Sequence, residues 1–211
     1  VRQMILAADG YASMLDKVAA ATSDEEKDAI EAEYAEAKRQ FEGALEELLP
    51  HQREDFVGIF TAMAGLPVTV RLLDPPLHEF LPQETGNQKQ MAERLGVPVK
   101  IVKDKVDQLH EFNPMLGHRG CRLAVTYPPI YRMQARAIIE AALNVKKAGK
   151  KVLPEIMIPL TGAVSELKFV KDEIVDEINK GFKERKSKIK HLGGPMIEVP
   201  RAAVTADEVA Q

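Results

Sequence analysis

"TVRLLDPPLHEFLP", residues 69–82, places a charged side chain inside an apolar run. Arg71 lies in the middle of the run, Asp74 closes it, and a double proline follows. A nearly continuous apolar run is typical of a strand that is covered on both faces, and proline cannot continue such a strand. The stretch therefore predicts a buried strand that ends near Asp74 and carries an arginine in need of a partner or a polar opening.

Strand-like and helix-like segments alternate after residue 66. Two further apolar runs, KVLPEIMIPL and GGPMIEVP, are separated and preceded by segments with helical periodicity, at residues 87–111 (in two pieces split near Gly96), 129–149 and 164–189. This alternation predicts an α/β protein with a parallel sheet, either a (β/α)8 barrel or a doubly wound sheet. No glycine-rich nucleotide loop follows any of the strands, which weakens the second alternative. Three strands complete neither fold, so we expect a partial (β/α)8 TIM barrel.

The first part of the chain is helical in pattern. Ser23 or Asp24 can cap a helix, and one apolar stripe then recurs at three- and four-residue steps, through Ile30, Tyr34, Ala37, Phe41, Leu45 and Leu48. Pro50 is expected to break this helix, and a shorter one follows to about Gly65. We therefore divide the chain into a helical segment, residues 1–65, that leads into a barrel part, residues 66–211. At the other end, Thr205 and Glu208 have the spacing of a capping box.

Composition limits the partners and the compartment. The net charge of −3 argues against a dedicated nucleic-acid surface, and no stretch approaches the roughly 20 apolar residues of a membrane span. The beginning of the chain lacks the pattern of a secretory signal, and it lacks a starting methionine, which indicates a fragment or a processed product. A single cysteine, Cys121, cannot form an internal disulfide, which favours a reducing compartment such as the cytoplasm.

Charged residues stand where the first and third predicted strands end. Functional groups of a (β/α)8 barrel lie at the carboxyl ends of its strands, and these ends supply Arg71 with Asp74, and Glu198 with Arg201. A guanidinium that Asp74 orients suits a phosphate or a carboxylate, whereas an Arg71–Asp74 pair can equally just close the barrel mouth. A carboxylate at residue 198 suits Mg²⁺, or else an ion pair with an arginine.

The motif GHRGCR, residues 117–122, is a third candidate. It places Arg119 in a glycine-rich turn that can approach an anion closely, although a basic surface loop has the same appearance. Residue propensities do not decide whether residues 123–127 form a short strand or a loop with a short helix. Cys121 has no evident neighbour that would lower its pKa, so we interpret it as a small buried residue.

Several stretches resemble one known family. VTVRLLDPPLHEFLP, QLHEFNPMLGHRGCRLAVTYP, PEIMIPL, ELKFVKDEIV and GPMIEVPRAAVTADEVA are similar to the C-terminal phosphoenolpyruvate/pyruvate-binding domain of the phosphoenolpyruvate-utilising enzymes. LDPPLHEFLP and HEFNPMLGHRGCRL resemble the pyruvate phosphate dikinases more than the related phosphoenolpyruvate synthases. The resemblance implies a (β/α)8 barrel, with GHRGCRLAVTYP as a loop and short helix inserted after the Arg71 strand.

The resemblance also implies roles for four residues. Arg71 and Arg119 correspond to catalytic arginines that bind the phosphoryl group and the anionic substrate. Asp74 corresponds to a substrate-site residue beside them, and Glu198 to a substrate-site residue that is one of two acidic ligands of a catalytic Mg²⁺. The second metal carboxylate, a catalytic cysteine and a phosphohistidine domain are implied to lie outside this chain.

The reaction implied is that of the dikinase, in which ATP, pyruvate and phosphate are interconverted with AMP, phosphoenolpyruvate and diphosphate. The implied partners are pyruvate or phosphoenolpyruvate and the phosphohistidine domain of the same enzyme, in a homodimeric parent, with no nucleic acid and no membrane. The cytoplasm is the expected compartment, or a plastid in a plant. We expect the isolated chain to be inactive. The alternatives are a fragment of another phosphotransferase such as phosphoenolpyruvate synthase, or a non-catalytic binding or assembly fragment.

Overall fold

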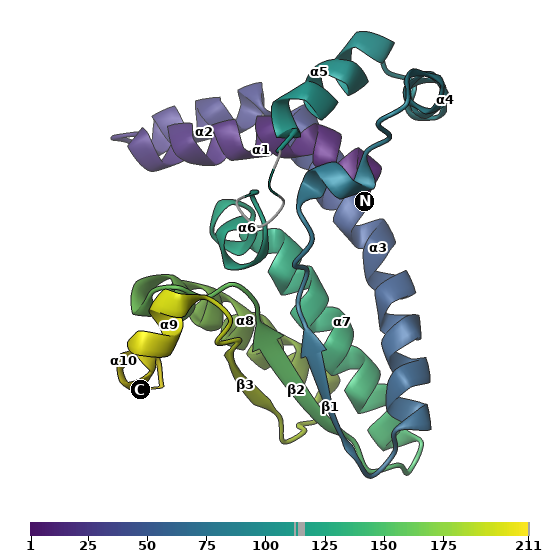
Figure 1. Cartoon of the computed structure of the whole chain (residues 1–211), viewed down its shortest axis with the longest axis vertical. Helices are drawn as coiled ribbons and strands as arrows, with labels where there is room; N and C mark the ends of the chain where they lie inside the picture. The colour runs from purple at the N-terminus through teal and green to yellow at the C-terminus, as the bar shows by residue number, and fades with distance from the viewer. Residues whose placement is uncertain (112, 114–116, 211) are drawn as a thin grey trace. The chain divides into compact units, whose positions relative to one another are not determined.

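The computed structural model describes residues 1–111, 113 and 117–210, which group into two compact units (Figure 1). Unit 1 comprises Val1–Leu45 and Pro75–His118, and unit 2 comprises Glu46–Asp74 and Arg119–Gln211. These units are defined by their compactness and do not test the predicted division into residues 1–65 and 66–211, which stays a prediction. Within the described ranges, no helix has the length and the apolar content that crossing a membrane requires.

Unit 1 is helical. Its elements are α1 (Arg2–Ala20), α2 (Asp24–Glu33), the first part of α3 (Ala35–Ala62), the 3₁₀ helix η1 (Leu77–Phe80), α4 (Thr85–Leu95) and α5 (Val99–Leu109). Ser23 caps α2 as predicted, since its side chain accepts a hydrogen bond from the N–H of Glu26 over 3.2 Å. Apolar side chains of α1 and α3 form the core, where the rings of Tyr11 and Phe41 stack with centroids 4.5 Å apart.

The predicted helix break at Pro50 is wrong. Helix α3 runs through Pro50, and the interruption lies at Tyr34, between α2 and α3. An interior proline removes one backbone N–H and crowds the preceding turn, which costs about 3 kcal/mol. Phe41 and Phe60 are buried on either side of Pro50, so tertiary packing of a long helix offsets that cost.

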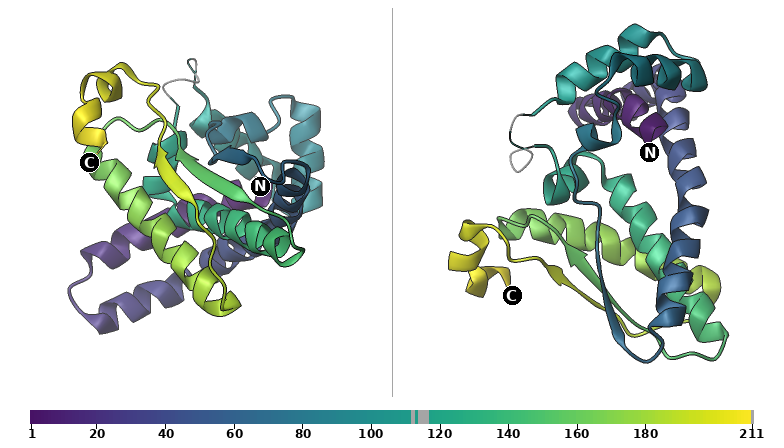
Figure 2. Two further views of the ribbon diagram at one scale, coloured as in Figure 1. Left: turned by 90° about the horizontal axis from the view of Figure 1, so that it is seen from below. Right: turned by 45° about the vertical axis from the view of Figure 1, so that its right-hand side comes forward.

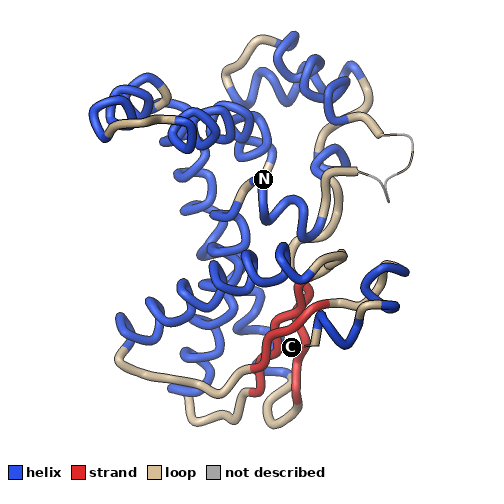
Figure 3. Tube along the Cα trace, turned by 90° about the vertical axis from the view of Figure 1, so that its left-hand side faces the viewer, coloured by secondary structure: helices blue, strands red, loops and turns tan. Residues whose placement is uncertain are grey.

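Unit 2 contains a three-stranded parallel sheet, as the sequence predicted, with the strand order β1-β2-β3. The strands are β1 (Pro67–Arg71), β2 (Leu153–Ile158) and β3 (Leu192–Pro195), drawn in red in Figure 3. The register pairs Arg71 with Met157 and Ile158 with Pro195, so the carboxyl ends of the three strands lie along one edge of the sheet.

Helices cover one face of this sheet. Helices α7 (Pro128–Lys147) and α8 (Val164–Arg185) lie on the same side of the strands in Figures 1 and 2. Ile156 and Ile158 are buried beneath them, whereas Thr69 and Arg71, on the opposite face of β1, are exposed. The prediction that β1 is covered on both faces is therefore wrong for the described part of the chain. The helix-free face of a β/α sheet is the one that lines the interior of a barrel.

The connections settle one open point and correct two predictions. Residues Gly120–Thr126 form the short helix α6, so the alternative of a strand at 123–127 is wrong. Strand β3 ends at Pro195 instead of continuing to Glu198, because Met196 makes the last bond to β2 and Pro200 already begins α9 (Pro200–Val204). Helix α10 (Ala206–Val209) follows, but the Thr205 hydroxyl donates back to the carbonyl of Arg201 and does not cap it.

A buried carboxylate ties three helices of unit 2 together. Glu140 of α7, 4% exposed, accepts a hydrogen bond from Arg53 of α3 over 2.5 Å and one from Arg136 of α7 over 3.1 Å. Arg185 of α8 lies 3.3 Å away. Burial alone would raise the pKa of Glu140, but the hydrogen bonds from the arginines and their charges outweigh burial and hold this pKa below its ordinary value.

Candidate functional site

The four predicted site residues all belong to unit 2, near the carboxyl ends of its strands. Arg71 is the last residue of β1, and Asp74 follows three residues later. Arg119 is the N-cap residue of α6, and Glu198 lies between β3 and α9. The structure brings Arg71, Asp74 and Arg119 into direct contact, and it connects Glu198 to them through the turn after β2.

Asp74 is the centre of this group. Its carboxylate, 2% exposed, accepts a hydrogen bond from Nε of Arg119 over 3.2 Å at Oδ1, and a second one from Nη2 of Arg119 at Oδ2. Nη1 of Arg71 lies 3.6 Å from the same Oδ2. Such forked, charge-assisted bonds fix the plane of a guanidinium. One buried carboxylate therefore orients two arginines, and the three groups together carry a net positive charge that suits an anion.

The two arginines differ in exposure. The side chain of Arg71 is 48% exposed and that of Arg119 is 16% exposed. Arg71 alternates along β1 with Val70, whose side chain faces the helices, so the guanidinium of Arg71 lies on the helix-free face. The arginine in the apolar run is therefore not a buried charge: Arg71 is exposed on the helix-free face, whereas Asp74 is buried but paired.

Gly120 lets α6 approach this group closely. Its φ of +55° is one that side chains disfavour, and a Cβ there would lie 2.7 Å from the Cβ of Leu160 and 3.1 Å from Oδ1 of Asp74. The N–H of the next residue, Cys121, bonds to the carbonyl of Pro159 over 3.0 Å. The glycine noted in the GHRGCR motif therefore joins the end of β1 to the turn after β2.

Glu198 is attached to the same turn. Its Oε1 accepts the backbone N–H of Leu160 over 2.7 Å, and Leu160 has φ 58°, a conformation uncommon outside glycine. Glu198 is exposed rather than buried, which corrects the expectation from its apolar neighbours. Among the described residues it makes no ion pair, so the alternative of a pair with an arginine such as Arg201 is not observed there.

No cluster of three or more histidine, cysteine or acidic side chains suited to a metal occurs within the described ranges. Glu198 fits one part of a magnesium site. One of its oxygens is engaged by Leu160 and the other is bonded to no described residue. Mg²⁺ typically takes one or two protein carboxylates and fills its other positions with water and substrate oxygens, so a single carboxylate that faces solvent fits that requirement.

Cys121 is not a reactive thiol. It is fully buried in α6, and burial, together with the negative charge of Glu166, raises the pKa of the thiol to about 12, although Arg122 acts in the opposite direction. The prediction of a small buried residue is confirmed.

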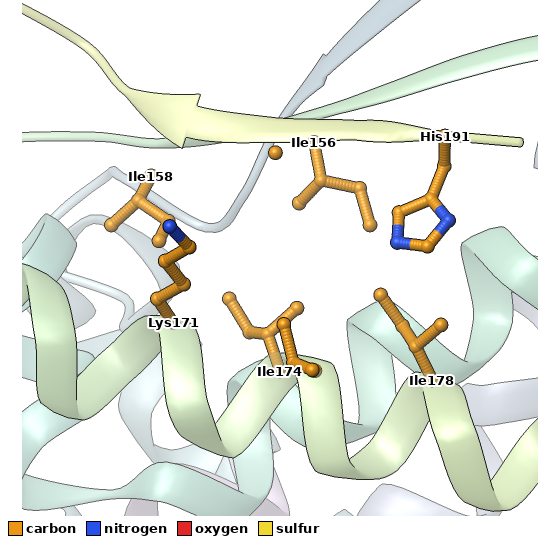
Figure 4. Close-up of a pocket in the computed structure, with 8 residues that line it drawn as sticks. Ile156, Ile158, Lys171, Ile174, Ile178 and His191 are labelled. Carbon is orange, nitrogen blue, oxygen red and sulfur yellow. The ribbon is translucent and has the colours of Figure 1, made fainter. Parts of the chain in front are cut away.

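A separate apolar cavity lies between the sheet and α8 (Figure 4). It has a volume of about 180 Å³, and its lining side chains include Ile156, Ile158, Ile174 and Ile178, with Lys171 and His191 as the ionisable groups. These side chains approach it from β2, α8 and the segment before β3 (Figure 4). The cavity is on the helix-covered side of the sheet and contains none of the four site residues, so it is not the anion site.

Comparison with known proteins identifies the class. A family model described as "PEP-utilising enzyme, PEP-binding domain" matches residues 14–211, and the chain belongs to this family of phosphoenolpyruvate-utilising enzymes. Three adjacent parallel strands with helices on one face are accordingly part of a (β/α)8 barrel.

The relatives are more particular. The chain is 54% identical over 171 residues to "Pyruvate, phosphate dikinase" of Clostridium symbiosum, with 81% of this chain and 20% of the relative covered. It is 53% identical over 169 residues to the protein of that name from Rhizobium meliloti, with 80% and 19% covered. A chloroplastic relative of that name from Arabidopsis thaliana is 50% identical over 174 residues, with 82% and 18% covered. The chain thus spans about one fifth of the length of these relatives.

Proposed function

We propose that this chain supplies part of the phosphoenolpyruvate/pyruvate site of a pyruvate phosphate dikinase, which interconverts ATP, pyruvate and phosphate with AMP, phosphoenolpyruvate and diphosphate. The observation that carries the proposal is the buried Asp74, which contacts both Arg71 and Arg119. The family match and relatives of that name support it.

The step that concerns this domain is transfer of a phosphoryl group from a phosphohistidine to pyruvate. The methyl group of pyruvate gives up a proton to a group elsewhere in the enzyme, which returns it in the reverse direction, and the enolate forms. The P–N bond then breaks, and a P–O bond forms to the enolate oxygen. Enolate and phosphoryl group are both anionic, so the reaction needs fixed positive charge where they meet. Arg71 and Arg119 are the proposed catalytic groups that contact the phosphoryl oxygens, and Asp74 keeps their guanidinium planes in place.

Glu198 is the proposed ligand of Mg²⁺ in this chain, and the N–H of Leu160 orients its carboxylate. When bound, Mg²⁺ would supply positive charge at the pyruvate oxygens. The second acidic ligand and the group that protonates the enolate are proposed to lie in other parts of the enzyme.

The remaining partners are also proposals. The phosphohistidine is expected on another domain of the same parent enzyme, which we propose to be a homodimer in the cytoplasm, or in the plastid of a plant, with no nucleic acid and no membrane as partner. A lone buried cysteine is in keeping with a reducing compartment. Because the chain carries only part of the site, we expect it to be inactive by itself, and pyruvate/phosphoenolpyruvate exchange by the isolated chain would contradict this.

The test is a chimera in which this chain replaces the matching segment of the Clostridium symbiosum dikinase. The chimera should catalyse phosphoryl exchange between phosphoenolpyruvate and the enzyme, and Arg71→Ala should lower that rate by a factor on the order of 10² to 10³. Arg132→Ala is the matched control. Arg132 is exposed to a similar extent, at 41%, but its guanidinium pairs with Glu173 of α8 and not with Asp74. An unchanged rate with Arg71→Ala, or an equal loss with Arg132→Ala, would refute the assignment.

A further inference from the structure

The backbone between Arg71 and Asp74 leaves the sheet before it reaches the site. The last bond from β1 to β2 joins the N–H of Leu72 to the carbonyl of Met157 over 3.0 Å. Leu73 lies beyond this bond, so its N–H and its carbonyl have no strand partner. Unpaired backbone groups in a partly buried position are costly, and they also leave the chain free to shift.

Two side chains of α7 take the place of that strand partner. The hydroxyl of Tyr131 donates to the carbonyl of Leu73 over 2.7 Å, and the N–H of Leu73 donates to Oε1 of Gln134 over 2.8 Å. Tyr131 and Gln134 are three residues apart, so they project from the same face of the helix. They are 1% and 8% exposed, respectively, and the other buried residues of α7 are apolar except for Glu140.

The surroundings of Tyr131 and Gln134 fix which group donates and which group accepts in each of the two bonds. The pKa of Tyr131 is raised, mainly because its hydroxyl is buried and also because Cys121 and Asp74 are near, so the hydroxyl keeps the proton that it donates. Nε2 of Gln134 is directed to Oε1 of Gln52 over 3.4 Å, which leaves its carbonyl oxygen for Leu73. Side chains of α7, a helix that packs against the sheet, therefore hold both the N–H and the carbonyl of Leu73.

We infer that Tyr131 and Gln134 are positioning residues of the anion site, which fix the backbone at Leu73 so that Asp74 can hold Arg71 and Arg119 together. The inference rests on the proposed function, since it concerns the same arginines. The inference predicts that loss of either bond to Leu73 weakens the hydrogen bonds between Asp74 and Arg119 while unit 2 is still folded. It also predicts weaker binding of a phosphorylated carboxylate.

The readout is the Nε–H signal of Arg119 in the ¹⁵N-labelled full chain, because this group donates directly to Asp74. The signal is assigned by its loss in Arg119→Lys, and it is followed with and without phosphoenolpyruvate. Tyr131→Phe removes only the hydroxyl and keeps the buried ring. Gln134→Met removes the acceptor at similar volume, and Gln134→Glu restores an acceptor, since the amide of Gln52 can rotate to donate to it.

The control is Gln88→Met in unit 1. Gln88 is also buried, at 5% exposed, and it bonds to backbone carbonyls of Pro82 and Gln83. This variant should lose stability without any change in the Arg119 signal. Urea unfolding of every variant confirms that each one is folded.

We expect Tyr131→Phe and Gln134→Met to shift the Arg119 signal toward that of an unpaired guanidinium and to weaken phosphoenolpyruvate binding about fivefold. Gln134→Glu should restore both. A signal and an affinity equal to those of the original chain in both variants would overturn the inference, as would an equal shift in Gln88→Met. If the chimera shows no phosphoryl exchange, the proposed function fails, whereas the ligand-free Arg119 signal still decides the positioning role.

Discussion

Arg119 donates its Nε–H to Oδ1 of Asp74 over 3.2 Å, although 45 residues separate the two in the chain. The contact is made because α6 begins at Gly120, beside the turn after β2, while Asp74 follows the end of β1. Arg71 joins the same carboxylate from the strand itself, at 3.6 Å. The anion site proposed here is therefore a property of the folded sheet edge and not of one motif.

Asp74→Asn should weaken both the fold and the site. Loss of the carboxylate leaves Arg119 with a neutral partner, and we expect the free energy of unfolding to fall by about 2 kcal/mol. Removing a negative charge also favours anions, by about 1 kcal/mol at a solvent-exposed mouth, but loss of the forked geometry outweighs this gain. Phosphoenolpyruvate binding should thus become about tenfold weaker in a calorimetric titration. Tighter binding by Asp74→Asn would show that charge, not orientation, controls the site.

Gly120→Ala should destabilise unit 2. The added Cβ meets the Cβ of Leu160 at 2.7 Å in a backbone conformation that alanine disfavours, so we expect a loss of about 2 to 3 kcal/mol in urea unfolding. Gly58→Ala is the control, because Gly58 is helical and nothing lies within 4 Å of its added Cβ. That change should stabilise the chain by about 0.5 to 1 kcal/mol. Equal effects at both positions would contradict the close packing at Gly120.

Much of unit 2 follows from sequence periodicity. Helices α7 and α8 and strand β2 lie where the patterns predict them, because burial on one face leaves a clear spacing of apolar residues. The predicted break at Pro50 is wrong because the tendency of proline to interrupt a helix is local, whereas packing on both sides of Pro50 keeps α3 continuous. The prediction that Arg71 lies near a strand end is confirmed, because a strand end is recognisable without knowledge of distant contacts, whereas the role of Arg71 in the site stays a prediction.

The contacts of the site could not be predicted in the same way. Tyr131 and Gln134 appear in the sequence only as polar interruptions of an apolar helix face. Their partner, Leu73, is 58 and 61 residues away. The position of Leu160 and its bond to Glu198 depend on a turn whose conformation is unusual for leucine, which propensity does not reveal. Polar residues on a buried helix face are the one sequence signal that could have indicated the roles of Tyr131 and Gln134.

Cys121 should resist thiol reagents in the native chain. With a pKa of about 12, only on the order of one thiol in ten thousand is ionised at pH 8, and the side chain is fully buried. We expect Ellman's reagent to react slowly in buffer and within seconds in guanidinium chloride, with no reaction in Cys121→Ser. Rapid reaction of the native chain would show that α6 opens readily.

Glu140→Gln should make stability less dependent on acid pH. The pKa of Glu140 is lowered from 4.5, so its stabilisation is present above the unfolded-state value and is lost as the pH falls through the lower folded-state value. The arginines around it are 28% to 41% exposed, so we expect a loss of about 2 kcal/mol at pH 7, less than for a fully buried pair.

The measurement is urea unfolding of both proteins between pH 7 and pH 3. The stability difference should shrink as the pH falls below about 4. Glu47→Gln, a change at an exposed residue of unit 2, is the control and should have little effect at any pH. A difference that stays constant across this range would mean that the ion network contributes no charge-dependent stability.

The central claim is that Arg71 and Arg119, oriented by Asp74, bind the phosphoenolpyruvate anion. The most direct test is a titration of the ¹⁵N-labelled chain with phosphoenolpyruvate in the presence of Mg²⁺, observed at the arginine Nε–H signals. We expect the signals of Arg71 and Arg119 to shift saturably, with a dissociation constant on the order of 1 mM, while that of Arg132 stays unchanged. No shift at either site arginine, or a uniform shift of all three, would contradict the account.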